Sequence, residues 1–279
     1  MVAARFETSD GVSLSYEDSG SGLPVLCLPG LTRNARDFDD LATILPTDVR
    51  MIRLTSRGRG QSDWDPNFAN YAVPIEARDA LELLDHLGLD QTAVFGTSRG
   101  GILSMVLALT AKPRLLGVLL NDIGPEIAPQ GLEVIYDYIG RRPAGADYAA
   151  VGQALKASMG ADFPDLTDAR WQVLAERWFV KDAEGVGLRY DPRLRDAVLA
   201  QAQAEQPDLW PFFDGFEGLP LAVVRGENSN LLTAETLERM QRRRPDMIAR
   251  TVPNRGHVPF LDEPQSAEAV HALISALRG

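Results

Sequence analysis

A serine flanked by two glycines is the residue whose setting first points to chemistry. Ser98 stands in Gly96-Thr97-Ser98-Arg99-Gly100, between a short apolar run at 93–95 and an almost wholly apolar stretch at 102–109. These patterns predict a buried strand before the serine and a buried helix after it. A serine on the tight turn between strand and helix is presented as a nucleophile, and the glycines let the two elements approach closely. The alternative is a glycine-rich turn that holds an incidental serine.

A serine hydroxyl is a poor nucleophile at neutral pH and needs a neighbouring base. The chain has three histidines. His86 and His271 fall within predicted helices, where surface or edge positions are expected. His257 falls in a predicted loop after the last strand, and loops beyond strand ends are where catalytic groups collect. We therefore expect His257 to be the base for Ser98, which would otherwise have no plausible partner.

The elements that must position these residues alternate along the chain. After an N-terminal hairpin over 5–17, apolar strands are predicted at 24–28, 49–54, 93–95, 115–122, 219–225 and 248–252. Amphipathic or apolar helices are predicted at 34–45, 74–87, 102–109, 234–244 and 266–277. Apolar strands that alternate with helices indicate an α/β fold with a mostly parallel sheet covered on both faces.

This alternation stops between residues 125 and 218. The segment has helical, amphipathic patterning that Pro and Gly interrupt repeatedly. We interpret it as a helical cap inserted between two strands, so that residues 1–124 and 219–279 form one core domain. Its aromatic residues pack within the cap or line a pocket, and we expect one or two of them to touch substrate; they are Trp171, Trp178, Trp210, Phe212 and Phe213.

Composition excludes several other classes of protein. The formal net charge is −11, which argues against a nucleic-acid groove or an anionic membrane surface as partner. The single cysteine, Cys27, excludes an internal disulfide and lies in an apolar run. No stretch resembles a signal peptide or a membrane span, which predicts a cytoplasmic protein that acts on a small molecule. Nothing in the chain suggests a metal or cofactor site.

Four motifs in their order and context resemble those of the α/β-hydrolase superfamily. They are the turn Leu28-Pro29-Gly30-Leu31, the loop 56–62 (Ser-Arg-Gly-Arg-Gly-Gln-Ser), the Ser98 motif, and the segment 254–264 that contains His257. The resemblance covers nearly the whole chain. It implies an eight-stranded, mostly parallel sheet with helices on both faces and a helical cap between the sixth and seventh strands.

The resemblance also implies an oxyanion hole made of two backbone N–H groups. One belongs to Arg99, which follows the nucleophile, and the other to Leu31, in the loop after the third strand. Pro29-Gly30 stands where many relatives have His-Gly, so the loop architecture transfers but a histidine side chain does not. The arginines of the 56–62 loop are expected to pack near the Ser98 turn rather than to bind an anion.

The acid of the expected triad departs from the family pattern. Relatives usually place an aspartate a few residues after a Gly-Glu or Gly-Asp, and here Asn230 stands at that position. Asn230 is an engineered replacement, a natural residue with the acid elsewhere, or a sign of lost activity. Asp122 ends the sixth strand, from which some haloalkane dehalogenases supply their acid, and it is our choice. Glu126 and Glu227 are weaker candidates.

These features predict a cofactor-independent serine hydrolase that cleaves an ester or lactone of a small, largely apolar substrate through an acyl-enzyme on Ser98. A C–C bond hydrolase for β-diketone-like substrates uses similar residues and is the alternative among enzymes. An epoxide hydrolase or dehalogenase is disfavoured, because those relatives carry an aspartate nucleophile. The alternative from another class is a ligand-binding protein on the hydrolase scaffold, which Asn230 motivates.

Overall fold

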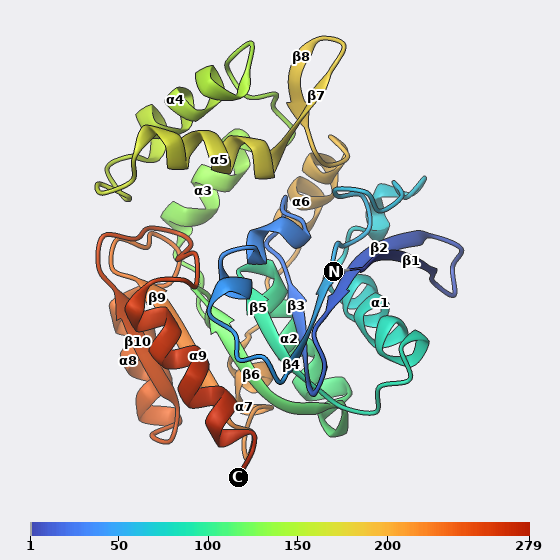
Figure 1. Cartoon of the computed structure of the whole chain (residues 1–279), viewed down its shortest axis with the longest axis vertical. Helices are drawn as coiled ribbons and strands as arrows, with labels where there is room; N and C mark the ends of the chain where they lie inside the picture. Colours follow the sequence, from blue (N-terminus) through green and yellow to red (C-terminus); the bar gives the residue numbers. More distant parts are fainter. Residues whose placement is uncertain (1) are drawn as a thin grey trace.

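An eight-stranded sheet runs through the centre of the computed structural model, which describes residues 2–279 (Figure 1). Its strand order is β1-β2-β4-β3-β5-β6-β9-β10. The strands are β1 (Val2–Glu7), β2 (Ser13–Ser19), β3 (Leu23–Leu28), β4 (Val49–Leu54), β5 (Thr92–Thr97), β6 (Leu115–Asn121), β9 (Leu221–Gly226) and β10 (Ile248–Val252). The pairs β1–β2 and β2–β4 are antiparallel, and all other neighbouring strands of this sheet run parallel. The predicted mostly parallel α/β sheet is confirmed.

Two apolar layers cover the sheet because alternate strand residues point to opposite faces. Leu26 and Leu28 of β3 pack into one cluster, whereas Val25 and Cys27 pack into the other. On the first face lie α1 (Val73–His86), α2 (Arg99–Thr110), α7 (Trp210–Asp214) and α8 (Ala234–Arg243). On the second face lie α9 (Pro264–Ala276) and the 3₁₀ turns η1 (Ala35–Phe38) and η2 (Leu41–Thr43).

The predicted helix over 34–45 is wrong, since the structure has only η1 and η2 there. The break falls at Asp39 and Asp40, whose carboxylates face arginines on other segments. Asp39 pairs with Arg53 of β4, and Asp40 pairs with Arg177 from the segment between β6 and β9. These long-range ion pairs favour two short turns over one continuous helix, because both carboxylates then reach arginines on other segments.

The segment between β6 and β9 is helical, as expected, but it also holds a β-hairpin. It contains α3 (Pro129–Tyr138), α4 (Tyr148–Met159), α5 (Asp168–Trp178), α6 (Leu194–Ala202) and α7, with the hairpin β7 (Phe179–Asp182) and β8 (Gly185–Leu188). In Figure 1, α4, α5 and the hairpin lie at the top, above the sheet. Helix α7 instead packs against α2 on the sheet.

Candidate active site

Ser98 lies on a sharp turn between β5 and α2. Its φ of 50° and ψ of −114° place it in a region that L-residues rarely adopt, as a nucleophile turn requires. Glycine at 100 is a physical necessity, because a Cβ there would stand 1.9 Å from the carbonyl oxygen of Leu28. At Gly96 a Cβ would stand 2.5 Å from the backbone of Gly100. The two flanking glycines therefore permit the turn that presents the Ser98 hydroxyl.

The three residues expected to act together lie in hydrogen-bond contact. The Nε2 atom of His257 is 2.9 Å from Ser98 Oγ, and its Nδ1 atom is 2.7 Å from Asp122 Oδ2. His257 comes from the loop after β10, and Asp122 follows directly after β6. The arrangement can move a proton from a serine hydroxyl to an imidazole that a carboxylate orients.

Asp122 is fully buried and its carboxylate is held from two sides. Oδ1 accepts a hydrogen bond from the backbone N–H of Gly226 at 2.8 Å, and Oδ2 accepts one from Ser229 Oγ at 2.6 Å. Its backbone also has a left-handed φ of 56°. These two hydrogen bonds fix the orientation of the carboxylate beside His257. Ser229 is a contact that the sequence did not single out.

The other acid candidates lie in different surroundings. Glu126 accepts from Trp210 Nε1 at 3.0 Å and pairs with Arg239. Glu227 accepts from the backbone N–H of Asn254 at 3.1 Å. The backbone of Asn230 packs beside Gly131, and among residues 2–279 it makes no hydrogen bond to His257. The structure thus brings Asp122, and not these three, to the imidazole.

The two backbone amides expected to form an oxyanion hole lie on segments that adjoin Ser98. Neither Leu31 N–H nor Arg99 N–H donates to an acceptor within the described chain. The loop that carries Leu31 approaches closely, since a Cβ built on Gly30 would stand 3.8 Å from Ser98 Cβ. Two free amides near a serine hydroxyl can stabilise a developing oxyanion.

A buried ion cluster connects the two segments that carry these amides. Glu76 of α1 accepts from Arg59 at 2.7 Å and from Arg99 Nε at 2.6 Å. Arg59 in turn donates to the carbonyl oxygen of Leu31 at 2.8 Å. Burial raises the pKa of Glu76, but the charges of Arg59 and Arg99 outweigh it and hold the pKa below its usual value.

Glu76 was missed by the sequence analysis. An acidic residue in the first turn of a helix is ordinary, because it complements the helix dipole. Only the distant contacts of Glu76 distinguish it. The loop arginine Arg57 has a different role, since it is buried among Asp10, Asp65 and Asp79. Both loop arginines therefore form internal ion pairs, as expected for residues that pack in the core rather than bind an external anion.

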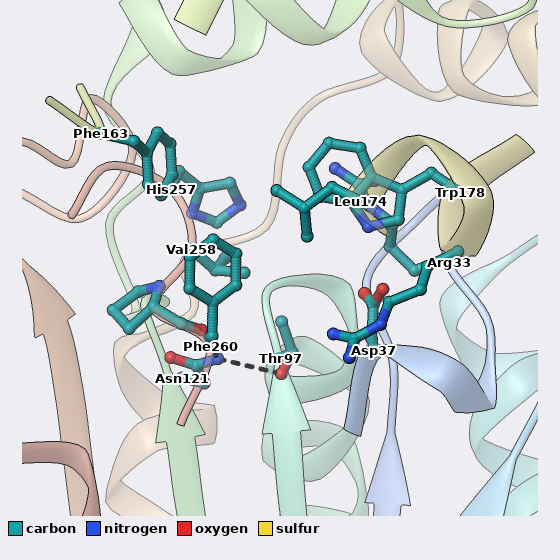
Figure 2. Close-up of a pocket in the computed structure, with 12 residues that line it drawn as sticks. Arg33, Asp37, Thr97, Asn121, Phe163, Leu174, Trp178, His257, Val258 and Phe260 are labelled. Atoms are coloured by element: carbon teal, nitrogen blue, oxygen red, sulfur yellow. Dashed lines mark hydrogen bonds between the residues drawn. The ribbon is translucent and has the colours of Figure 1, made fainter. Parts of the chain in front are cut away.

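A pocket adjoins His257 (Figure 2). Its lining combines apolar and polar side chains from several parts of the chain. They are Arg33 and Asp37, before and within η1; Thr97 and Asn121, at the ends of β5 and β6; Phe163, Leu174, Arg177 and Trp178, from the inserted segment; and residues 257–260, after β10. Burial raises the pKa of Asp37 to about 6, although the charges of Arg33 and Arg177 lower it. The pocket thus combines apolar surface with the ionisable side chains of Arg33, Asp37 and Arg177.

Of the aromatic residues expected near substrate, Trp178 alone lines this pocket within the described chain. Trp171 packs edge-on against Phe163, at a centroid distance of 6.0 Å. The other three pack with the sheet layer through α7; they are Trp210, Phe212 and Phe213.

The remaining histidines lie away from Ser98. His86 stacks on Phe6 at 5.6 Å, and His271 Nε2 is 2.8 Å from the carbonyl oxygen of Ile44. Within residues 2–279, no group of three or more His, Cys, Asp or Glu side chains is placed to hold a metal ion. No helix in the same range is long and apolar enough to cross a bilayer.

Most of the chain is similar in sequence to known hydrolases. The family model described as "Alpha/beta hydrolase family" matches residues 25–270. A 3-hydroxybutyrate-oligomer hydrolase of Cupriavidus necator is 36% identical over 264 residues, which cover 91% of this chain and 89% of that protein. A 2-(acetamidomethylene)succinate hydrolase of Mesorhizobium japonicum is 28% identical and covers 88% of this chain and 85% of that protein.

A solved structure has nearly the same backbone. The crystal structure of an α/β hydrolase from Novosphingobium aromaticivorans matches with a TM-score of 0.92 and 37% sequence identity, and covers 98% of each chain.

Proposed function

The chain belongs to the α/β-hydrolase family and is a hydrolase, and from this premise we propose that it cleaves carboxylic esters through Ser98. The single observation that carries the proposal is the continuous path of hydrogen bonds from Ser98 Oγ through His257 to the buried carboxylate of Asp122. The 3-hydroxybutyrate-oligomer hydrolase that resembles this chain supports the choice, because the linkage within such an oligomer is an ester.

The geometry permits the following sequence of steps. Ser98 Oγ attacks the ester carbonyl while its proton passes to His257 Nε2, and Asp122 stabilises the imidazolium. The carbonyl oxygen, now negatively charged, accepts hydrogen bonds from the amides of Leu31 and Arg99. His257 then protonates the leaving alcohol, and a water molecule that His257 deprotonates releases the acid from Ser98.

We further propose that residues 125–218 act as a cap on a core formed by residues 1–124 and 219–279. Phe163, Leu174 and Trp178 from this segment line the pocket beside His257. Helix α7 is an exception, since it packs on the core side against α2. A cap of this kind shields the acyl-enzyme and selects the substrate by shape.

The test replaces Ser98 by alanine and follows the hydrolysis of p-nitrophenyl butyrate. We expect Ser98→Ala to abolish turnover while the circular dichroism spectrum and thermal unfolding stay unchanged. A fluorophosphonate probe should label the unaltered protein at Ser98 and should not label the variant. Undiminished hydrolysis by Ser98→Ala contradicts the mechanism, and a lack of any esterase activity in the unaltered protein favours the C–C hydrolase or ligand-binding alternative.

A further inference from the structure

Of the two arginines that line the pocket, Arg33 is the one that forms no ion pair within residues 2–279. Its guanidinium stacks on Trp178, with the central carbon 3.3 Å from the ring centroid. Among the described residues, Arg33 forms no ion pair and no side-chain hydrogen bond. None of its guanidinium nitrogens is sealed from solvent. Its donors are therefore unpaired and accessible in a residue that lines the pocket, while stacking restricts the orientation of the planar group.

The neighbouring arginines differ from Arg33 in this respect. Arg177 lines the same pocket, but two of its nitrogens bind Asp40 at 2.5 and 3.0 Å. Arg99 and Arg59 are both bound by the buried carboxylate of Glu76. The contrast matters, because a paired guanidinium has few donors left for a ligand, whereas Arg33 offers an unoccupied fork.

Asp37 is the acidic residue that faces Arg33 within the pocket. The two groups interact electrostatically, since the charge of Arg33 lowers the pKa of Asp37, but their side chains form no ion pair. Because Asp37 does not occupy the guanidinium donors, an incoming anion can bind them in the bidentate manner that arginine and carboxylate prefer.

Arg33 also lies within reach of the reacting group. The position of a Cβ on Gly30 would be 3.3 Å from Arg33 Cγ and 3.8 Å from Ser98 Cβ, so both side chains flank the same point. His257 lines the pocket together with Arg33. A small molecule whose ester carbonyl sits at Ser98 can therefore extend toward the guanidinium.

We infer that Arg33 binds a carboxylate of the substrate, an inference that rests on the proposed esterase function. The preferred substrates are then hydroxy-acid esters that carry a free carboxylate, such as short linear oligomers, rather than neutral apolar esters. Trp178 positions the guanidinium by stacking, and Arg33 is the residue that determines specificity.

The test compares two substrates that differ only in charge. One is the linear dimer of 3-hydroxybutyrate, and the other is the same dimer with its terminal carboxylate replaced by a carboxamide. We expect Arg33→Gln to raise KM for the carboxylate dimer by tenfold or more and to change KM for the carboxamide by less than twofold. Arg33→Lys, which keeps the charge but not the fork, should lie between. The control Arg242→Gln removes an equal charge from an exposed side chain and should change neither value.

A binding measurement keeps the inference testable without turnover. In the Ser98→Ala background, calorimetry should show that the carboxylate dimer binds at least tenfold more tightly than the carboxamide, and that Arg33→Gln removes this difference. Equal binding of both compounds, or a parallel loss for both in Arg33→Gln, overturns the inference. If neutral esters are still hydrolysed through Ser98 in that case, the proposed function stands; if no ester is hydrolysed by the unaltered protein, both fail.

Discussion

Ser229 Oγ donates a hydrogen bond to Asp122 Oδ2 at 2.6 Å, and so connects the loop after β9 to the carboxylate at the end of β6. The backbone N–H of Gly226, the last residue of β9, donates to the other carboxylate oxygen. The loop that contains Asn230 therefore holds the acid in place instead of supplying it. This relationship explains how an asparagine can stand at position 230 without leaving His257 unsupported.

Replacement of Asp122 by asparagine should leave the fold intact and strongly reduce turnover. Asparagine tolerates the left-handed backbone at this position, but its amide cannot stabilise the imidazolium and favours the wrong tautomer of His257. We expect kcat for p-nitrophenyl butyrate to fall by about 10³- to 10⁴-fold. Stopped-flow or steady-state assays measure the loss, and thermal unfolding checks the fold. A variant with near-normal kcat would show that another group supports the base.

Replacement of Asn230 by aspartate should give no substantial gain in rate. The imidazole already has a carboxylate partner at 2.7 Å, and Asn230 makes no hydrogen bond to it within the described chain. We expect kcat/KM to stay within about threefold of the unaltered protein, well under the 1.4 kcal/mol that a tenfold change represents. A gain of two orders of magnitude or more would show that Asp122 does not serve as the acid.

Loss of the Glu76 charge should destabilise the protein. Glu76→Gln leaves Arg59 and Arg99 as buried cations without their shared carboxylate. Removal of one partner from a buried ion pair costs about 3 to 5 kcal/mol of unfolding free energy. Urea denaturation measures this cost. The matched control is Glu238→Gln, whose exposed ion pair with Arg242 should contribute less than about 1 kcal/mol. Equal effects of the two substitutions would contradict a role for burial.

The pKa of Asp37 predicts a specific pH dependence of stability. Burial raises this pKa from 3.8 to about 6 in the folded protein, so the folded state holds the proton more tightly than the unfolded chain. Stability that the protonated form provides is therefore lost as the pH rises from about 4 to about 6. We expect Asp37→Asn to gain stability relative to the unaltered protein over this interval. Urea denaturation at pH 4.5 and pH 7.5 tests this, and a difference that does not change with pH would refute it.

The sequence by itself predicted the strands of the central sheet and singled out Ser98 and His257. Apolar runs predicted the central strands because these strands are covered on both faces, so that nearly every residue in them is apolar. The glycines at 96 and 100 predicted the Ser98 turn, because a residue with a Cβ does not fit at either position. The resemblance of the four motifs then indicated the family that the fold and the comparisons confirm.

The contacts between distant segments were decided only by the tertiary structure. Asp122 and Glu126 are almost neighbours in the chain, yet one faces His257 and the other faces Arg239. The segment 34–45 has helical periodicity, but ion pairs with β4 and α5 divide it into two short turns. Glu76, Ser229 and Arg33 carry no local signal, because their significance depends on whether a partner from elsewhere in the chain reaches them. Long-range electrostatics and packing act on the folded chain, and a linear pattern does not record them.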